Sequence, residues 1–138
     1  SDATFKLVCI GGQVLNTAER YEIYANVAPY ERYQLLNRLE LEGIKNVIFI
    51  SGDRHHSELN RLELSEDNVV YDFTSSPLTS GSGRNVDEMN ANRVPETLVS
   101  ERNFGFIEFS GPREDRKMRM SIRNVEGEEI WSYEIVAQ

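Results

Sequence analysis

Two side chains that could bind a metal ion follow a short apolar stretch near the middle of the chain. The segment reads Ser51-Gly52-Asp53-Arg54-His55-His56, in which Asp53 offers carboxylate oxygens and His55 an imidazole nitrogen. Residues two apart in an extended loop project to the same side. This pair of donors suits iron, manganese or zinc, and the carboxylate alone suits calcium. We therefore predict that Asp53 and His55 bind a divalent or trivalent metal ion.

The other side chains of this turn could support that chemistry. Arg54 and His56 could bind a phosphate oxygen of a substrate or orient the metal ligands, and His55 and His56 are the candidate catalytic groups. A simpler interpretation is an ordinary Gly-Asp turn, with Asp53 as a cap and two histidines on the surface. Both histidines of the chain lie here, directly after its most apolar predicted strand. This placement favours the metal hypothesis.

Length, composition and charge narrow the range of partners. The 138 residues fit one domain, and no apolar run approaches the roughly 20 residues of a membrane span. The net charge of −8 disfavours nucleic acid, although bound metal ions could still attract a phosphorylated substrate. Cys9 is the only cysteine, so no internal disulfide can form, and its apolar neighbours predict a buried side chain.

Apolar runs predict the elements that position the turn. Residues 5–10 and 47–50 are almost wholly apolar, which is typical of parallel strands buried on both faces. Between them, a helix is predicted to begin at Pro29 and end at Gly43. Its apolar stripe consists of Tyr33, Leu35, Leu36 and Leu39. Strand, helix and strand predict a parallel βαβ unit, with the turn at the carboxyl end of the second strand, where ligands bind in open α/β sheets.

The second half of the chain has a different pattern. Residues 58–64 fit a strand or a short helix, residues 69–73 fit a strand, and residues 74–93 form a long polar loop of the kind that is usually functional or mobile. Three strands are predicted near the end of the chain, at residues 104–109, 118–122 and 131–135, and in the last two apolar residues alternate with polar ones. Together they predict an antiparallel meander. The predicted fold class is mixed α/β (α+β): a parallel βαβ unit followed by this meander, in a single domain spanning residues 1–138.

Several segments together resemble PhoD-like alkaline phosphatases, which are calcineurin-like metallophosphoesterases. The segments are Phe5-Lys6-Leu7-Val8, residues 47–59, residues 71–79 and Arg102-Asn103-Phe104-Gly105, in the order of the family. The resemblance implies an αββα sandwich with a binuclear metal centre (Fe, Ca, Mn or Zn) that hydrolyses phosphate mono- or diesters. Asp53 and His55 match the family's late metal-ligand turn. Asn103 is a candidate substrate-binding residue and could equally be an ordinary loop residue.

The resemblance is to the C-terminal half of the family. Further ligands come from motifs that precede the segment resembling residues 5–10, and the chain has no third histidine. We therefore expect one corner of a site, little activity from this chain alone, and a missing N-terminal half as partner. Open sheet edges could instead pair two copies. The alternative is a noncatalytic binding or assembly module with a vestigial turn. The resemblance also implies export to the periplasm or the extracellular space.

Overall fold

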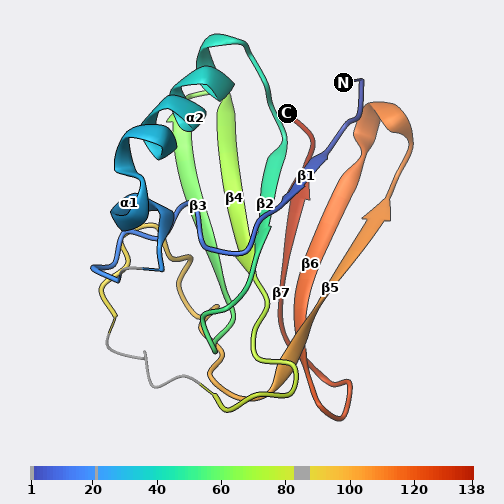
Figure 1. The fold of residues 1–138 in the computed structure, drawn as a ribbon. Coiled ribbons are helices and arrows are strands. Elements are labelled where there is room, and N and C mark those ends of the chain that lie inside the picture. Colours follow the sequence, from blue (N-terminus) through green and yellow to red (C-terminus); the bar gives the residue numbers. More distant parts are fainter. Residues whose placement is uncertain (1, 21, 83–87) are drawn as a thin grey trace.

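The computed structural model describes residues 2–20, 22–82 and 88–138 as two facing sheets with helices on one side (Figure 1). Its helices are α1 (Tyr24–Val27), α2 (Pro29–Leu41) and a 3-10 turn, η2 (Arg113–Asp115). The strands of the first sheet are β1 (Lys6–Cys9), β2 (Val47–Ser51), β3 (Glu58–Ser65) and β4 (Asn68–Thr74). The strands of the second sheet are β5 (Asn103–Ser110), β6 (Lys117–Asn124) and β7 (Glu129–Val136).

The first sheet has the strand order β1-β2-β4-β3. Strands β1, β2 and β4 run parallel, whereas β3 is antiparallel to β4. The predicted βαβ unit is therefore confirmed, and the ambiguous segment 58–64 is a strand. Because parallel strands end at the same edge of a sheet, the carboxyl ends of β1, β2 and β4 lie together. The turn that follows β2 begins at this edge.

The second sheet is the predicted antiparallel meander, in the order β5-β6-β7. Its central strand turns Met118, Met120 and Ile122 inward, and all three are fully buried. They form one core cluster with side chains of the first sheet, including Leu59 and Phe73. The two sheets therefore pack face to face, and burial of this apolar surface is the main term that holds them together.

Helix α2 covers the opposite face of the first sheet (Figure 1). Pro29 occupies its first turn and Gly43, at φ 60°, follows its end, as predicted. Leu36 and Leu39 pack on the sheet, but Tyr33 is 63% exposed, so its predicted place in the core is wrong. The stripe that faces the sheet is narrower than the sequence pattern indicated. Neither helix of the described ranges is long and apolar enough to cross a membrane.

The described residues thus form three layers, a helical layer and two sheets. In these ranges no α-helix lies over the outer face of the second sheet, which is where a four-layer sandwich would have one (Figure 1). Strand β1 also departs from expectation. Leu7 and Val8 are each 42% exposed and Cys9 is exposed, so their predicted burial is wrong. The reason is that β1 is an edge strand, whose only partner in the sheet is β2.

Gly105, on β5, packs directly against the ring of Phe73 in the first sheet. A Cβ atom at this position would lie 2.8 Å from Cε1 and 2.9 Å from Cζ of Phe73. We expect Gly105→Ala to lower the free energy of unfolding by about 1–3 kcal/mol, because the Phe73 ring would have to leave its packed position. Urea unfolding measures this change. Gly11→Ala is the matched control, since no atom lies within 4 Å of its added Cβ. Equal losses in both variants would contradict the packing argument.

Candidate metal centre

The turn after β2 carries the predicted metal ligands in an unusual backbone conformation. Asp53 has φ 62° and His55 has φ 56°, so both are left-handed, which non-glycine residues rarely adopt. The expected extended path is therefore wrong at these two positions. The backbone N–H of His55 donates a hydrogen bond to Ser76 Oγ at 3.0 Å. Contacts of this kind must hold the turn, because each left-handed residue costs of the order of 1 kcal/mol or more.

Exposure alternates along the turn. Asp53 and His55 are exposed, whereas Arg54 and His56 are only 3% and 1% exposed. The two predicted metal ligands therefore reach solvent at the carboxyl ends of the parallel strands. Arg54 and His56, two of the three predicted substrate-binding residues, lie behind the turn in the protein interior. Substrate contact by Arg54 and His56 stays a prediction, as does catalysis by His56. In this arrangement both side chains are buried, so a substrate has no open path to them.

The imidazole of His55 is oriented by a backbone carbonyl. Its Nδ1 lies 2.7 Å from the carbonyl oxygen of Gly81. A carbonyl can only accept a hydrogen bond, so Nδ1 carries the proton of the neutral ring and Nε2 keeps its lone pair. Metal-binding histidines usually donate their second ring N–H to a carbonyl or carboxylate in this way. His55 thus presents an unprotonated nitrogen on the exposed side of the turn.

Arg54 is held by two carboxylates. Its Nη1 donates to Glu22 Oε2 at 2.8 Å, and its Nη2 donates to Glu88 Oε2. The side chain of Glu88 is 2% exposed and that of Glu22 is 39% exposed. A guanidinium group can satisfy two carboxylates at once because its donors form a rigid planar fork. Arg54 therefore ties the turn to two segments that are distant in the sequence.

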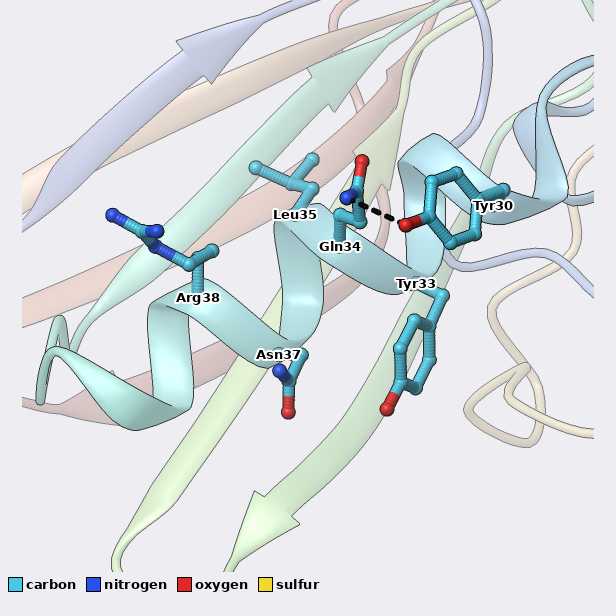
Figure 2. Close-up of a pocket in the computed structure, with 6 residues that line it drawn as sticks. All are labelled: Tyr30, Tyr33, Gln34, Leu35, Asn37 and Arg38. Carbon is cyan, nitrogen blue, oxygen red and sulfur yellow. Dashed lines mark hydrogen bonds between the residues drawn. The ribbon is translucent and has the colours of Figure 1, made fainter.

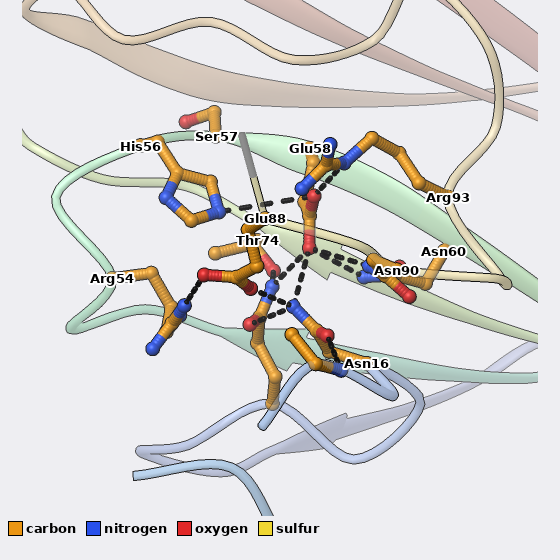
Figure 3. Close-up of polar contacts among 12 residues, drawn as sticks. Asn16, Arg54, His56, Ser57, Glu58, Asn60, Thr74, Glu88, Asn90 and Arg93 are labelled. Atoms are coloured by element: carbon orange, nitrogen blue, oxygen red, sulfur yellow. Dashed lines mark hydrogen bonds and ion pairs between the residues drawn. The ribbon is translucent and has the colours of Figure 1, made fainter. Parts of the chain in front are cut away.

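Glu58, the first residue of β3, is the centre of a buried polar network that sequence reasoning missed (Figure 3). Its side chain is fully buried. Oε2 accepts from Nε of Arg93 and lies 3.8 Å from Nε2 of His56, which is too long for a hydrogen bond. Oε1 accepts from four side-chain amides, those of Gln13 at 2.6 Å, Asn16 at 3.0 Å, Asn60 at 3.1 Å and Asn90 at 3.0 Å.

These contacts decide the charge of Glu58. Burial alone would raise the pKa of this carboxyl, but the interactions with His56 and Arg93 outweigh burial and lower the pKa to about 2. Glu58 is therefore ionised at neutral pH. No local sequence signal identifies it, because a glutamate at the start of a strand is usually exposed. Its amide donors come from three separate parts of the chain, so only the folded structure brings the network together.

Asp72 is a second buried carboxylate, on β4, that sequence reasoning did not single out. Its Oδ2 accepts from the backbone N–H groups of Val14 and Leu15 at 2.6 Å and 2.9 Å, and its Oδ1 accepts from Ser51 Oγ at 2.6 Å. Complete burial raises the pKa of Asp72 to about 6, although these three hydrogen bonds lower it in part. Asp72 fixes the loop that follows β1 against the end of β2, immediately before the candidate metal ligands.

The raised pKa of Asp72 predicts a pH dependence of stability. The folded state binds a proton near pH 6, whereas the unfolded chain binds it near pH 4. The contribution of Asp72 therefore becomes more favourable as the pH falls from 6 to 4, by up to about 3 kcal/mol. Asp72→Asn keeps the shape and removes this titration. The difference in unfolding free energy between wild type and variant, measured by urea unfolding, should grow in favour of wild type as the pH falls. A constant difference would contradict the shift.

Asn103, the third candidate substrate-binding residue, is 1% exposed. Its Oδ1 accepts from Ser57 Oγ at 2.5 Å, and its Nδ2 donates to the carbonyl oxygen of Ser76 at 3.1 Å. Ser57 Oγ also accepts a hydrogen bond from the backbone N–H of Ser76 at 2.9 Å. In this arrangement Asn103 braces the loop that carries Ser76, which in turn bonds His55. A substrate-binding role for Asn103 stays a prediction.

The donor set of the turn fits one part of a metal site. In the described ranges, no three His, Cys, Asp or Glu side chains are grouped so that they could hold a metal ion. Asp53 and His55 supply one oxygen ligand and one nitrogen ligand, whereas catalytic zinc sites use three protein ligands. The buried carboxylates behind the turn, Glu58 and Glu88, are already neutralised by Arg93 and Arg54. The remaining ligands of a metal at Asp53 and His55 would have to come from outside these residues.

A groove on α2 is separate from this turn (Figure 2). It is lined by Tyr30, Tyr33, Gln34, Leu35, Asn37 and Arg38. All six belong to one helix, and Gln34 Nε2 donates to the hydroxyl of Tyr30 at 3.0 Å. The groove contains no carboxylate, histidine or cysteine, so it offers no metal ligand. The exposed part of the metal turn remains the candidate site.

Both the sequence and the fold of this chain are similar to those of known proteins. A family model described as PhoD-like phosphatase matches residues 15–118. No curated protein matches. A solved structure described as "Structure of PhoD" matches with a TM-score of 0.64 and 12% identity, over 99% of this chain and 32% of that chain. The chain therefore spans about a third of the length of that structure, and at this identity the match shows the fold alone.

The family match includes the turn of Asp53 and His55, Glu58 with three of its four amide donors, and strands β2 to β4. It covers well over half of the chain. This protein belongs to the PhoD-like phosphatase family.

Proposed function

We propose that this chain supplies Asp53 and His55 as ligands of a binuclear metal centre that hydrolyses phosphate mono- or diesters. The observation that carries the proposal is the exposed pair at the carboxyl ends of the parallel strands, with His55 Nδ1 bound to the Gly81 carbonyl. That contact leaves Nε2 of His55 free to bind a metal. When bound, iron, calcium, manganese or zinc would activate water and neutralise charge on the phosphoryl group.

The residues of this chain would bind the metal ions and hold the metal ligands in position. Asp53 would contribute a charged oxygen and His55 a neutral nitrogen, a mixed set that suits metals of intermediate hardness. Arg54, Ser76 and Gly81 would hold these two side chains in place through the contacts described above. Membership of the PhoD-like family supports a phosphate ester as substrate.

We further propose that the rest of the centre comes from a polypeptide segment that pairs with β1. Within the described part of the chain β1 pairs with β2 on one side only, and Leu7, Val8 and Ile10 are 42%, 42% and 37% exposed. An apolar strand with an open edge can accept another strand. The chain spans about a third of the PhoD structure it resembles, so a larger assembly would supply such a segment. A second copy of this chain could occupy the same edge. Export from the cytoplasm, implied by the family resemblance, stays a prediction.

The proposal is tested by comparing two polypeptides, residues 1–138 alone and the same residues with the segment encoded before them. Metal content and hydrolysis of a chromogenic phosphodiester are measured for both, together with their masses by sedimentation. We expect metal-dependent hydrolysis in the longer polypeptide only, and more self-association in the shorter one. A longer polypeptide that binds no metal and hydrolyses nothing would favour the noncatalytic module instead.

A further inference from the structure

Arg54 lies between the two candidate metal ligands, yet its side chain points away from solvent and is 1% exposed. A buried guanidinium is costly unless carboxylates satisfy it, and here Glu22 and Glu88 do so. A substrate phosphate could reach Arg54 only by displacing both carboxylates. The geometry therefore favours a role within the protein over direct contact with a ligand.

The two carboxylates come from segments on either side of the turn in sequence. Glu22 precedes α1, and Glu88 lies in the loop before β5. Glu88 also lies 3.6 Å from Nε of Arg20, and its Oε1 accepts from Asn16 Nδ2 at 2.8 Å. Asn16 in turn donates to Glu58. Arg54 thus joins the metal turn to the buried Glu58 network (Figure 3).

The ion pairs of Arg54 with Glu22 and Glu88 act at the point where the turn is strained. Asp53 and His55 flank Arg54 and both have positive φ, a conformation that persists only where surrounding contacts enforce it. Because the side chains alternate along the turn, a fixed inward Arg54 directs its two neighbours outward. Release of Arg54 would let the backbone relax and would move the imidazole of His55 away from the Gly81 carbonyl.

We infer that Arg54 is a positioning residue: its ion pairs with Glu22 and Glu88 hold Asp53 and His55 in the orientation that binds metal. This inference rests on the proposed function, since it takes Asp53 and His55 as the ligands. It assigns Arg54 no contact with substrate. The measurable consequence is the tautomer of His55, because the bond from Nδ1 to Gly81 exists only while the turn keeps its shape.

The chain offers a direct test because it contains only two histidines. Long-range ¹H–¹⁵N NMR spectra of the 138-residue protein at pH 8 report the tautomer of each ring, and His55→Ala assigns the signals. We expect the Nδ1–H tautomer for His55 in the wild type. In Arg54→Met, His55 should shift toward the Nε2–H tautomer, and the Kd for Zn²⁺ should rise about tenfold. Arg54→Lys should lie between them, because an ammonium group cannot reproduce the planar fork.

Arg38→Met is the matched control, since Arg38 is an exposed arginine on α2 that pairs with Glu42 across one helical turn. It should leave both readouts unchanged. If Arg54→Met does not fold, Glu22→Gln removes one partner at a half-exposed position and should produce a smaller shift in the same direction. An unchanged His55 tautomer in a folded Arg54→Met or Glu22→Gln variant would overturn the inference. Because the tautomer is read without metal, failure of wild type to bind Zn²⁺ would count against the proposed ligands and not against the role of Arg54.

Discussion

Asp53→Asn and His55→Ala should each lower kcat/KM for a phosphodiester by more than about 100-fold in the longer polypeptide. His55→Ala removes a ligand nitrogen and Asp53→Asn replaces a charged ligand oxygen by a neutral one, and loss even of the groups that only orient ligands typically costs 10–100-fold. Both side chains are exposed, so neither substitution removes a core contact. Steady-state hydrolysis and metal content per chain should fall together, which separates loss of metal from loss of folding.

Asp67→Asn provides the control for this pair. Asp67 is an aspartate whose side chain is 75% exposed, and it pairs with Lys45 at 2.5 Å in a surface ion pair. Such pairs contribute about 1 kcal/mol or less, and Asp67 lies between β3 and β4, at the end of the sheet opposite the metal turn. Its replacement should leave hydrolysis and metal content unchanged. Full activity in Asp53→Asn and His55→Ala would remove both residues from the proposed metal centre.

Glu58→Gln should lower the free energy of unfolding by about 3–5 kcal/mol at pH 7. The substitution removes the negative charge that satisfies Arg93, and breaking a buried pair on one side leaves an uncompensated charge in the interior. The new NH2 group would also have to face either the four amide donors at Oε1 or the Arg93 guanidinium at Oε2, so that donors face donors in both orientations. A loss of this size is a large part of the 5–15 kcal/mol that a typical domain has.

Glu63→Gln, on the same strand, is the matched control. The side chain of Glu63 is 62% exposed and pairs with Arg61, so its loss should cost about 1 kcal/mol or less. Urea unfolding at pH 7 compares the two variants. The contribution of the Glu58 charge is fully present above its unfolded pKa of about 4.5 and is lost as the pH falls toward 2. Similar losses in both variants would mean that Glu58 does not hold the network together.

The strands and α2 were predictable because their signals are local. Apolar runs located the strands of the βαβ unit and of the meander, and Pro29 and Gly43 marked the start and end of the helix. None of these signals requires knowledge of tertiary contacts. The wrong predictions concern residues whose burial depends on which other elements lie beside them. Whether β1 is central or at an edge depends on what lies beside it, and its apolar sequence reads the same in both cases. Tyr33 was misplaced because helical spacing gives the direction of a stripe but not its width.

The candidate site was predictable only on its exposed side. Asp53 and His55 stand close together in sequence, so their spacing could be read directly. The buried side depends on contacts between distant residues: the Asn16 amide meets Glu88 across 72 positions and Glu58 across 42. From the sequence, Arg54 was predicted either to bind a substrate phosphate or to orient the metal ligands, because it lies beside both candidate ligands. Its two carboxylate partners carry no sequence pattern that points to it.

The register of β1 has a consequence for how the chain acquires its structure. Lys6 pairs with Val47, so β1 must wait for loops and helix α2 to be synthesised before its partner exists. By contrast, β3 and β4 are joined by a short turn, and short connections, one of them with η2, join β5, β6 and β7. Closing a long loop costs more chain entropy than closing a short one. During translation the apolar residues of β1 therefore leave the ribosome before β2 does, and they stay without this partner until β2 follows. A chaperone that binds nascent chains would find an apolar target there during that interval.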